Sequence, residues 1–267
     1  MLSSCGDSMS KFTLIAGPCA IEDDVTPFLI AEKIKNICNN LNIRYIFKGS
    51  YKKANRTRLN SFTGIDKSQA LSVLKNIGKE FSIPTITDIH ESYEASEVSE
   101  YVDCLQIPAF LCRQTDLLIE AGKTGSLINI KKGQFVSPET MRFAVEKVRS
   151  TGNENIMLTE RGTTFGYNNL VVDFTSIPTM QSFSVPAILD ATHCLQRPNQ
   201  TSGVTGGDPN MIATMCYAGV AAGADGLFIE THPNPALAKS DSASMLQLDK
   251  LEAILDNCIS IRNVIKK

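Results

Sequence analysis

Val185-Pro186-Ala187-Ile188-Leu189, followed directly by Asp190 and then by His193, is the stretch that decides the fold of this chain. It is a short apolar run that leads into residues able to bind or react. An apolar run of four to eight residues is typical of a strand that is buried on both faces of a parallel sheet. One such run says little alone, so its weight depends on whether the pattern recurs.

The pattern does recur along the 267 residues of the chain, and nearly every run ends in a polar or ionisable residue. Stretches compatible with amphipathic helices separate most of the runs. Eight strands that alternate with helices predict an α/β fold of one domain, a (β/α)₈ barrel, with its reactive groups at the carboxyl ends of the strands. The other runs and the residues that follow them are 13–16 with Cys19, 45–47 with Lys48, 83–87 with Asp88, Leu105 with Gln106, 127–130 with Lys131, 156–159 with Glu160 and Arg161, and 227–229 with Glu230.

Composition and charge exclude several classes of protein. Hydrophobic residues make up 43% of the chain, enough for a sizeable core, and a formal net charge of −2 argues against a general binder of nucleic acids or anionic membranes. No apolar stretch approaches the roughly 18 residues of a membrane span. The eight Cys show no spacing of a disulfide framework, which is typical of reduced cytoplasmic thiols. We expect a cytoplasmic protein with a flexible segment at 1–11 and the barrel at 12–267.

Helical periodicity predicts six helices, and three other stretches are too polar or too irregular for the core. Each of these stretches, 49–64, 161–178 and 196–209, follows a predicted strand and should therefore form a long loop on the active rim. Met141, Phe143 and Met211 fit core positions. The expected helices cover 26–41, 67–81, 114–124, 138–150, 210–223 and 248–265.

Five cations lie at or just after three of the predicted strands. They are Lys48, Lys53, Arg56, Lys131 and Arg161. A closed barrel collects such residues at one rim, although any single one could be a solvated strand cap. Arginine offers a planar pair of donors and lysine a compact charge, so the set predicts a site for a compact polyanion, such as a phosphate ester that carries a carboxylate.

Four potential metal ligands follow strands that become neighbours when the barrel closes. Cys19, His193 and Glu230 follow the first, seventh and eighth strands, and Asp241 lies in the loop after the eighth. A thiolate, an imidazole and two carboxylates suit Zn²⁺, Fe²⁺ or Mn²⁺. The alternative without a metal is that Cys19 is a small buried hydrophobic residue and that the other three residues are hydrogen-bonded or solvated. A further histidine, His90, could serve substrate binding or acid–base chemistry.

The Lys-Ala-Asn-Arg element at 53–56, within 48–56, resembles the 3-deoxy-D-manno-octulosonate 8-phosphate synthase family. The resemblance runs nearly end to end, through 16–19, 87–91, 106–116, 129–135, 160–162, 165–167, 190–193 and 228–233. It implies a (β/α)₈ barrel that condenses phosphoenolpyruvate with arabinose 5-phosphate and water, releases phosphate, and feeds synthesis of the lipopolysaccharide core. Arg58 departs from the family pattern, in which small hydroxyl residues are common after Thr57.

The same resemblance implies roles for individual residues. Phosphoenolpyruvate would be held by Lys48, Lys53, Lys131 and Arg161, and the reacting end of the pocket would carry Asp88 and Gln106. Arabinose 5-phosphate would contact Asn55, Arg56 and, from a neighbouring subunit of a homotetramer, Arg113. The catalytic set would be Lys48, Lys131, Asp88, His193 and Cys19.

One class of this family has Cys in the first loop and needs a divalent metal, whereas the other class has Asn there and needs none. Cys19 is similar to the metal class, and His193, Glu230 and Asp241 match the remaining ligand positions. We therefore expect a bound divalent ion, Zn²⁺, Fe²⁺ or Mn²⁺, that would orient the aldehyde or a water molecule.

Three alternatives remain. A synthase using erythrose 4-phosphate would share the barrel, the cations and the metal, but that family usually has a Lys-Pro-Arg element at the position of 53–56. A Schiff-base aldolase would use Lys131. A non-catalytic barrel would sense a sugar phosphate or a metal ion.

Overall fold

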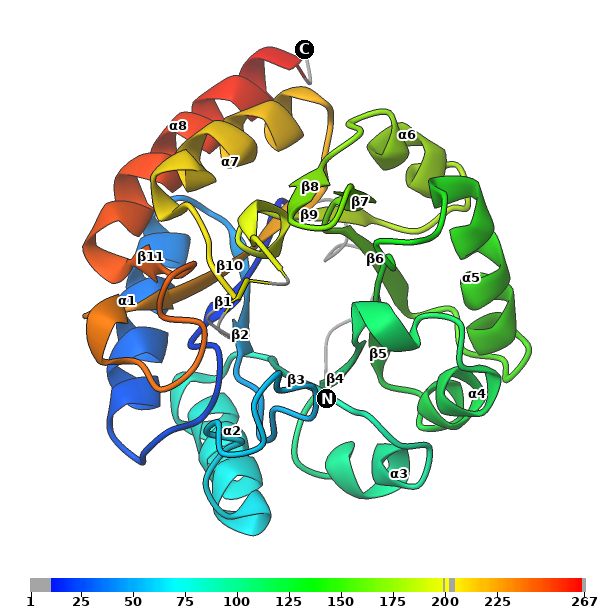
Figure 1. The fold of residues 1–267 in the computed structure, drawn as a ribbon, viewed down its shortest axis with the longest axis horizontal. Coiled ribbons are helices and arrows are strands. Elements are labelled where there is room, and N and C mark those ends of the chain that lie inside the picture. Colours follow the sequence, from blue (N-terminus) through cyan, green and yellow to red (C-terminus); the bar gives the residue numbers. More distant parts are fainter. Residues whose placement is uncertain (1–10, 199, 202–204, 266–267) are drawn as a thin grey trace.

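A computed structural model of the chain describes residues 11–198, 200–201 and 205–265. Apart from Lys11, the predicted flexible segment lies outside the described residues. The rest forms a barrel of parallel strands inside a ring of helices (Figure 1).

Eight parallel strands close on themselves. Each strand pairs with the next, and β10 pairs back with β1, where Gly17 lies opposite Glu230. This closure confirms the (β/α)₈ barrel. The strands are β1 (Thr13–Gly17), β2 (Arg44–Lys48), β3 (Thr85–Asp88), β4 (Cys104–Ile107), β5 (Leu127–Lys131), β6 (Ile156–Glu160), β9 (Ala187–Asp190) and β10 (Gly226–His232).

Helices follow the strands and cover the outside of the barrel (Figure 1). The six predicted helices are confirmed within a few residues at their ends, whereas α3 and α6 were not predicted. These two are shorter than two turns, so no apolar periodicity can develop in them, and α6 also contains Pro178. The helices are α1 (Thr26–Asn40), α2 (Lys67–Phe81), α3 (Glu94–Val98), α4 (Thr115–Lys123), α5 (Met141–Arg149), α6 (Ser176–Gln181), α7 (Ile212–Ala221) and α8 (Leu251–Ile265).

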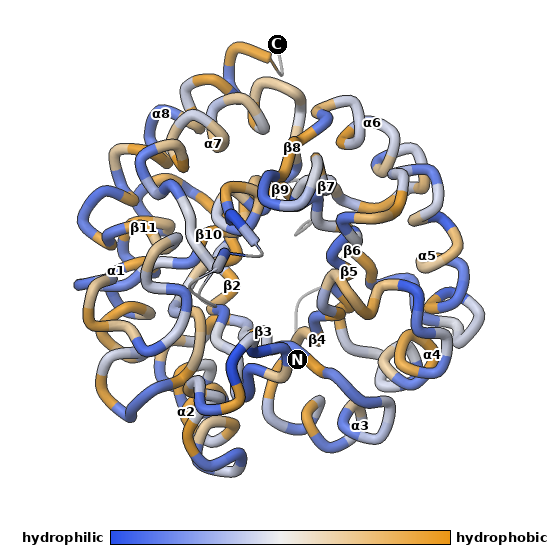
Figure 2. Tube along the Cα trace, in the orientation of Figure 1, coloured by the Kyte–Doolittle hydropathy of each residue, from blue (hydrophilic) through white to orange (hydrophobic). Residues whose placement is uncertain are grey.

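Helix α2 shows why the sequence specifies these elements locally. The side chain of Asp66 caps its start by accepting a hydrogen bond from the backbone N–H of Gln69, and Ser82 ends it in the left-handed conformation, with φ at 51°. Its buried residues recur at helical spacing and pack towards the strands: Ala70, Leu71, Val73, Leu74 and Ile77. Figure 2 shows hydrophobic and hydrophilic positions alternating along the helical tubes in the same way.

The inside of the barrel has an apolar layer with a polar layer above it. The apolar layer comprises Ile15, Ile46, Ile86, Cys104, Met157, Ile188 and Phe228. Because side chains alternate along a strand, the residue two positions later faces the interior again, nearer the carboxyl end. In five strands that residue is Lys48, Asp88, Gln106, Asp190 or Glu230. Each strand thus places its apolar run in the lower layer and its polar end in the upper layer, which explains the pattern seen in the sequence.

Gly17 allows β1 and β2 to approach closely just below Cys19. A Cβ atom at Gly17 would lie 2.0 Å from the carbonyl oxygen of Lys48, so no larger residue fits without moving the backbone. The glycine thus fixes where the chain leaves β1 and enters the loop that carries Cys19.

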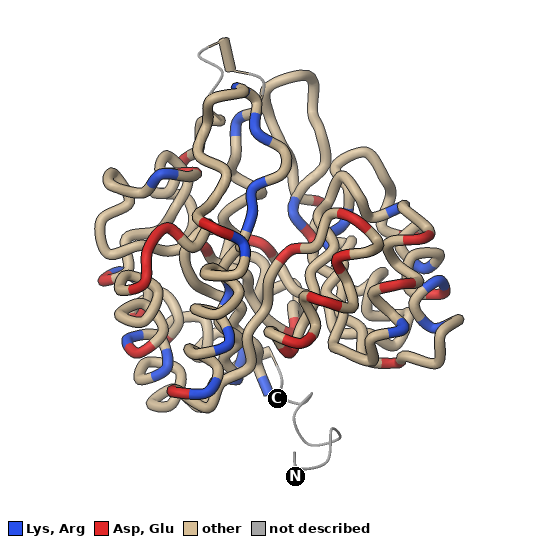
Figure 3. The backbone as a smooth tube through the Cα atoms, turned by 90° about the horizontal axis from the view of Figure 1, so that it is seen from below, with Lys and Arg blue, Asp and Glu red and all other residues tan. Residues whose placement is uncertain are grey.

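The long loops project from one end of the barrel, and several Lys and Arg positions lie along them (Figure 3). The predicted loop 161–178 contains an antiparallel hairpin, β7 (Thr163–Phe165) and β8 (Asn169–Val171), and the start of α6. A short strand, β11 (Leu246–Gln247), pairs with the end of β10.

Two of the predicted core positions were wrong. Met141 is buried, but Phe143 and Met211 are 48% and 43% exposed, because Phe143 is not among the buried positions of α5 and Met211 lies in a short 3-10 turn before α7. Within the described residues, no helix combines the length and apolar character needed to cross a membrane.

Candidate active site

A cavity of about 540 Å³ opens at the carboxyl end of the barrel, where the polar layer meets the long loops. Of the predicted site residues, all but Cys19 and Arg113 line it. The predicted residues in its wall are Lys48, Lys53, Asn55, Arg56, Asp88, Gln106, Lys131, Arg161, His193, Glu230 and Asp241. Barrel closure therefore brings together side chains from distant parts of the sequence, as predicted.

Two lysines on strand ends form short, buried ion pairs. Lys48 Nζ lies 2.6 Å from Glu230 Oε1 and donates to the carbonyl oxygen of Cys19 at 2.8 Å. Lys131 Nζ lies 2.6 Å from Asp190 Oδ2 and 3.5 Å from the centre of the Phe228 ring. Their positions are thus fixed by carboxylates and by an aromatic face before any substrate arrives.

The net shifts in pKa of the two lysines have opposite directions, because burial lowers both values and the neighbouring carboxylates oppose it to different extents. Desolvation lowers the pKa of Lys131 below its ordinary value, although Asp190 opposes the change. Desolvation also acts on Lys48, but the Glu230 carboxylate outweighs it and holds the pKa of Lys48 above its ordinary value. Lys131 is therefore the lysine that gives up its proton more readily.

Arg161 and Lys53 complete the cationic wall. Arg161 Nη2 donates to the carbonyl oxygen of His193 at 3.1 Å and to Gln196 Oε1 at 2.9 Å, so neutral acceptors hold it. Lys53 Nζ, on the loop after β2, lies 3.5 Å from Asp241 Oδ2. A guanidinium held by neutral groups keeps its full charge for an incoming anion.

A chain of hydrogen bonds crosses five adjacent strand ends and orients the polar layer. Ser50 and Gln106 both donate to Asp88, the latter from Nε2 to Oδ1 at 2.7 Å. Gln106 Oε1 accepts from Asn129 at 2.9 Å, and Asn129 Oδ1 accepts from Thr159 at 2.7 Å. Burial tends to raise the pKa of Asp88, but the nearby lysines more than reverse this, so its pKa lies well below the usual range. Asp88 is therefore a fixed anion and a weak base.

Cys19, Glu230 and Asp241 form a compact cluster with the composition of a metal site. One ligand atom from each lies within 4.8 Å of those of the other two, and Cys19 Sγ is 3.1 Å from Asp241 Oδ2. Glu230 Oε2 is buried and has no hydrogen-bond partner among the described residues. A buried carboxylate oxygen without a partner is costly unless something binds it, and a cation would satisfy it. These donors fit a divalent ion.

His193 lies beside this cluster, with one ring nitrogen near Glu230. Its Nδ1 atom is 2.7 Å from Asp190 Oδ2, and its Nε2 atom is 3.6 Å from Glu230 Oε1. A carboxylate on one ring nitrogen fixes the tautomer and leaves the other nitrogen free to bind an ion. The structure thus brings the fourth predicted ligand to the edge of the cluster.

Without an ion, the cluster favours a thiol. Burial, together with the Asp241 and Glu230 carboxylates, raises the pKa of Cys19 well above its ordinary value. A divalent cation would have the opposite effect on the pKa of the thiol. Its charge favours the deprotonated sulfur and offsets the repulsion between the sulfur and the two carboxylates.

Asp190 is a central residue of the site that the sequence predicted only as a strand end, without a role of its own. It is fully buried, its Oδ1 atom accepts from the backbone N–H groups of Thr192 and His193, and its Oδ2 atom serves both Lys131 and the His193 ring. The Asp-x-x-His spacing at the end of a predicted strand was the available signal. One carboxylate oxygen thus contacts both a lysine of the cationic wall and the histidine beside the Cys–Glu–Asp cluster.

His90 lies in the cavity wall, and its two predicted uses stay open. Its Nδ1 atom is 3.6 Å from Glu94 Oε2, and its ring meets the edge of Tyr51. Burial lowers its pKa, which favours the neutral ring. A neutral imidazole suits hydrogen bonding to a substrate and proton acceptance alike.

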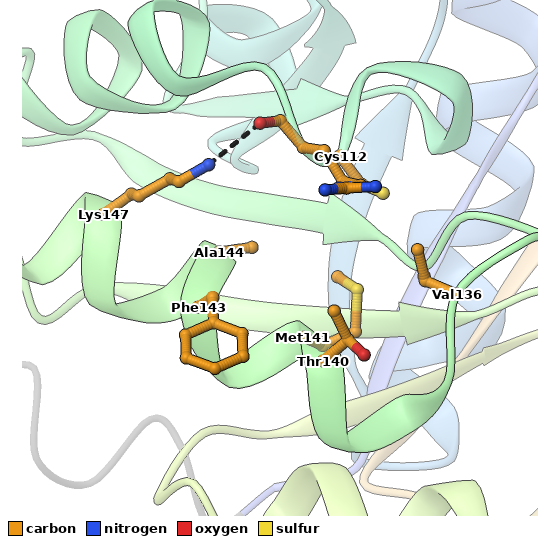
Figure 4. A pocket seen from close by; sticks show the side chains of 8 residues that line it. Cys112, Val136, Thr140, Met141, Phe143, Ala144 and Lys147 are labelled. Carbon is orange, nitrogen blue, oxygen red and sulfur yellow. Dashed lines mark hydrogen bonds between the residues drawn. The ribbon is translucent and has the colours of Figure 1, made fainter.

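Arg113 does not reach the cavity of its own chain. It is exposed and lines a separate pocket of about 190 Å³ between the loop after β4 and helix α5, where Lys147 Nζ donates to its carbonyl oxygen at 2.9 Å (Figure 4). The other lining residues are Cys112, Val136, Thr140, Met141, Phe143 and Ala144. A role for Arg113 at the barrel mouth therefore requires another subunit.

Comparison with known proteins gives one consistent result. Residues 5–267 match the DAHP synthetase I family. The chain is 48% identical to the 2-dehydro-3-deoxyphosphooctonate aldolase of Koribacter versatilis, over 96% of this chain and 92% of that protein. It is 48% identical to the protein of that name from Fusobacterium nucleatum, over 96% and 92%, and 49% identical to that from Nitratidesulfovibrio vulgaris strain DP4, over 91% and 89%.

Proposed function

This chain belongs to the DAHP synthetase I family, and we propose that it is a 2-dehydro-3-deoxyphosphooctonate aldolase, also called 3-deoxy-8-phosphooctulonate synthase. It condenses phosphoenolpyruvate with D-arabinose 5-phosphate and water to give 3-deoxy-D-manno-octulosonate 8-phosphate and phosphate. The observation that carries this proposal is one cavity whose wall holds four cations, Lys48, Lys53, Lys131 and Arg161, and the two carboxylates of the Cys–Glu–Asp cluster.

The cationic wall suits phosphoenolpyruvate. The ligand carries a phosphate and a carboxylate on a three-carbon frame, and both groups need fixed positive charge. Arg161 can bind two oxygens at once, while Lys48, Lys53 and Lys131 supply point charges from other sides. Binding of both anionic ends would hold phosphoenolpyruvate in one orientation. Carbon 3 would then face the aldehyde, which supplies much of the positioning needed for reaction.

The acceptor aldose suits the loop side of the cavity. Asn55 and Arg56 lie on the loop after β2 and line the same cavity, so Arg56 would take the phosphate of arabinose 5-phosphate. Arg113 would join it from a neighbouring subunit, because its side chain lines a separate pocket and is not in the wall of its own cavity. We propose a homotetramer because the resemblance to the synthase family implies one, and a cytoplasmic location because the described cysteines are free thiols.

The reaction follows from the chemistry of the two substrates. Carbon 3 of phosphoenolpyruvate forms a bond to the aldehyde carbon, water adds its oxygen to carbon 2, and phosphate leaves as carbon 2 becomes a ketone. Negative charge develops on the aldehyde oxygen, and a nearby lysine can stabilise it and supply the proton. Lys131 suits that role since burial lowers its pKa. Asp88 and Gln106, held by the hydrogen-bond chain, would position the reacting groups.

Cys19, His193, Glu230 and Asp241 would hold the divalent ion, Zn²⁺, Fe²⁺ or Mn²⁺. Bound there, it would supply a concentrated positive charge that polarises an oxygen atom of the aldose or of water. Asp190 prepares His193 for this by fixing its ring.

The test is a phosphate-release assay with phosphoenolpyruvate and one aldose at a time. We expect turnover with arabinose 5-phosphate, loss of turnover on chelation, and recovery on adding the metal back. Full activity of metal-free protein would refute the ion. Preference for erythrose 4-phosphate would favour a related synthase, and trapping of Lys131 by borohydride with substrate would favour a Schiff-base aldolase.

A further inference from the structure

Ser240 lies between two groups that the proposed function assigns to different tasks. Its side chain is 2% exposed and directly precedes Asp241 in the loop after β10. Cys19 Sγ lies 3.2 Å from Ser240 Oγ, and Arg56 Nη1 donates to the same oxygen at 3.0 Å. One buried hydroxyl therefore touches both the thiol of the ion cluster and the guanidinium of the acceptor loop.

The chemistry of a hydroxyl suits both contacts at once. Serine offers one proton and two lone pairs. Arg56 can only donate, so its hydrogen bond occupies one lone pair of the serine oxygen. The hydroxyl proton of Ser240 remains free to point elsewhere. When Cys19 binds an ion it does so as a thiolate, which has no proton and accepts hydrogen bonds. Ser240 can then accept from Arg56 and donate to Cys19 at the same time.

Few other side chains near Ser240 could make the same two hydrogen bonds. Among the described residues, Ser240 Oγ is the close acceptor for Arg56, since Asp241 Oδ1 is 3.7 Å from Nη1 and Arg56 Nε is buried without a partner. On the sulfur side, the other side-chain contact is Asp241 Oδ2 at 3.1 Å, and a carboxylate that binds an ion can only accept hydrogen bonds. Of the two described side chains in hydrogen-bond contact with Cys19, Ser240 is thus the one that can donate to a thiolate.

We propose that Ser240 is a positioning residue that links the ion site to the acceptor-sugar site. Its proton orients and stabilises the Cys19 thiolate, and its lone pair holds Arg56 over the end of the cavity where the aldose phosphate binds. The inference rests on the proposed function for the role of Arg56, whereas the contact to Cys19 needs only ion binding. Hydrogen bonds to metal ligands typically change metal affinity by about 10- to 100-fold.

The first test uses Co²⁺ as a spectroscopic probe of the thiolate. In the full-length protein loaded with Co²⁺, Ser240→Ala should shift the sulfur-to-cobalt charge-transfer band and weaken Co²⁺ binding by about 10-fold or more in a chelator competition. Ser240→Thr keeps the hydroxyl and should restore both. An unchanged band and affinity in Ser240→Ala would overturn the proposal, as would a wild-type protein that binds Co²⁺ without a thiolate band.

Ser244→Ala is the matched control. Ser244 lies in the same loop, is 3% exposed, and donates to the carbonyl oxygen of Asp241 at 3.1 Å instead of touching Cys19 or Arg56. It should leave the charge-transfer band in place. The same shift in both variants would show a general loosening of the loop and would overturn a specific role for Ser240.

The second test separates the two substrates. Ser240→Ala should raise the KM for arabinose 5-phosphate by about 3- to 10-fold, the worth of one hydrogen bond, with the KM for phosphoenolpyruvate unchanged. Its effect should largely vanish in an Arg56→Ala background, because Arg56 carries it. Fully additive effects would overturn the link. A cobalt band that depends on Ser240 in a protein that does not turn over arabinose 5-phosphate would refute the proposed function and support the contact to Cys19.

Discussion

The strand-borne and loop-borne halves of the cavity hold their charges differently. On the strand ends, Lys48 pairs with Glu230 and Lys131 with Asp190, each at 2.6 Å and with side chains no more than 7% exposed. On the loops, Lys53 and Arg56 lie 3.5 and 3.7 Å from Asp241, and these side chains are 14–21% exposed. The strand-end charges are closely paired and shielded from solvent, whereas the loop charges are more widely spaced and partly exposed to solvent.

This difference indicates which charged residues of the site also affect the stability of the fold. A strand-end charge is placed by sheet register and would be left buried and unpaired if its partner were removed. A loop charge keeps some contact with water and can move towards a ligand. We therefore expect strand-end substitutions to reduce stability and activity together, and loop substitutions to reduce affinity alone.

The largest effect should come from Glu230→Ala. It removes a cluster ligand and leaves Lys48 buried without its carboxylate, which should lower the free energy of unfolding by about 3–5 kcal/mol and abolish metal-dependent turnover. Urea denaturation measures the first effect. The control is Glu97→Ala, which breaks the exposed pair with Lys67 and should cost less than about 1 kcal/mol. Equal losses in the two variants would contradict the claim that a buried strand-end pair contributes more to stability than an exposed pair.

The next effect compares two arginines. Arg161→Ala, at a strand end and 5% exposed, should lower kcat/KM for phosphoenolpyruvate by about 10²- to 10³-fold, as loss of a preorganised charge does. Arg56→Ala, on the loop, should raise the KM for arabinose 5-phosphate by about 10-fold and leave the KM for phosphoenolpyruvate unchanged. Steady-state kinetics with each substrate varied separately measures both. Unchanged kinetics for Arg161→Ala would remove it from the site.

The smallest effect is a dependence of stability on acid. Burial tends to raise the pKa of Asp190, but His193 and Lys131 hold it well below the ordinary value. The unfolded chain therefore binds a proton that the folded chain refuses, and the stability from this group, present above about pH 4, is lost as pH falls. The loss should approach about 1.4 kcal/mol per pH unit. Asp190→Asn should flatten this part of the stability curve, and parallel curves would contradict the assignment.

The sequence predicted the barrel because its strands are buried on both faces and end in polar residues. The lysines at 48 and 131 could be placed at one rim, since parallel strands end on the same side and the barrel closes. The short helices α3 and α6 could not be predicted, because fewer than two turns show no period.

The sequence was less informative about partners within the site. Asp190 was visible only as a strand end, and nothing in the spacing showed that one of its oxygens serves both Lys131 and His193. Ser240 gave no signal, because a serine in a polar loop is ordinary until Cys19 and Arg56 are seen on either side of it. Such contacts depend on loop conformation, which local sequence specifies weakly.

The pairing of β10 with β1 has a consequence for when the site comes into being. Cys19 and Asp241 meet across 222 residues of chain, so a polypeptide emerging from the ribosome holds the sulfur ligand long before its carboxylate counterpart has been translated. Truncated or nascent forms would leave an incomplete coordination sphere. A divalent ion that needs both ligands would thus be bound only by the finished barrel, as a late step of maturation.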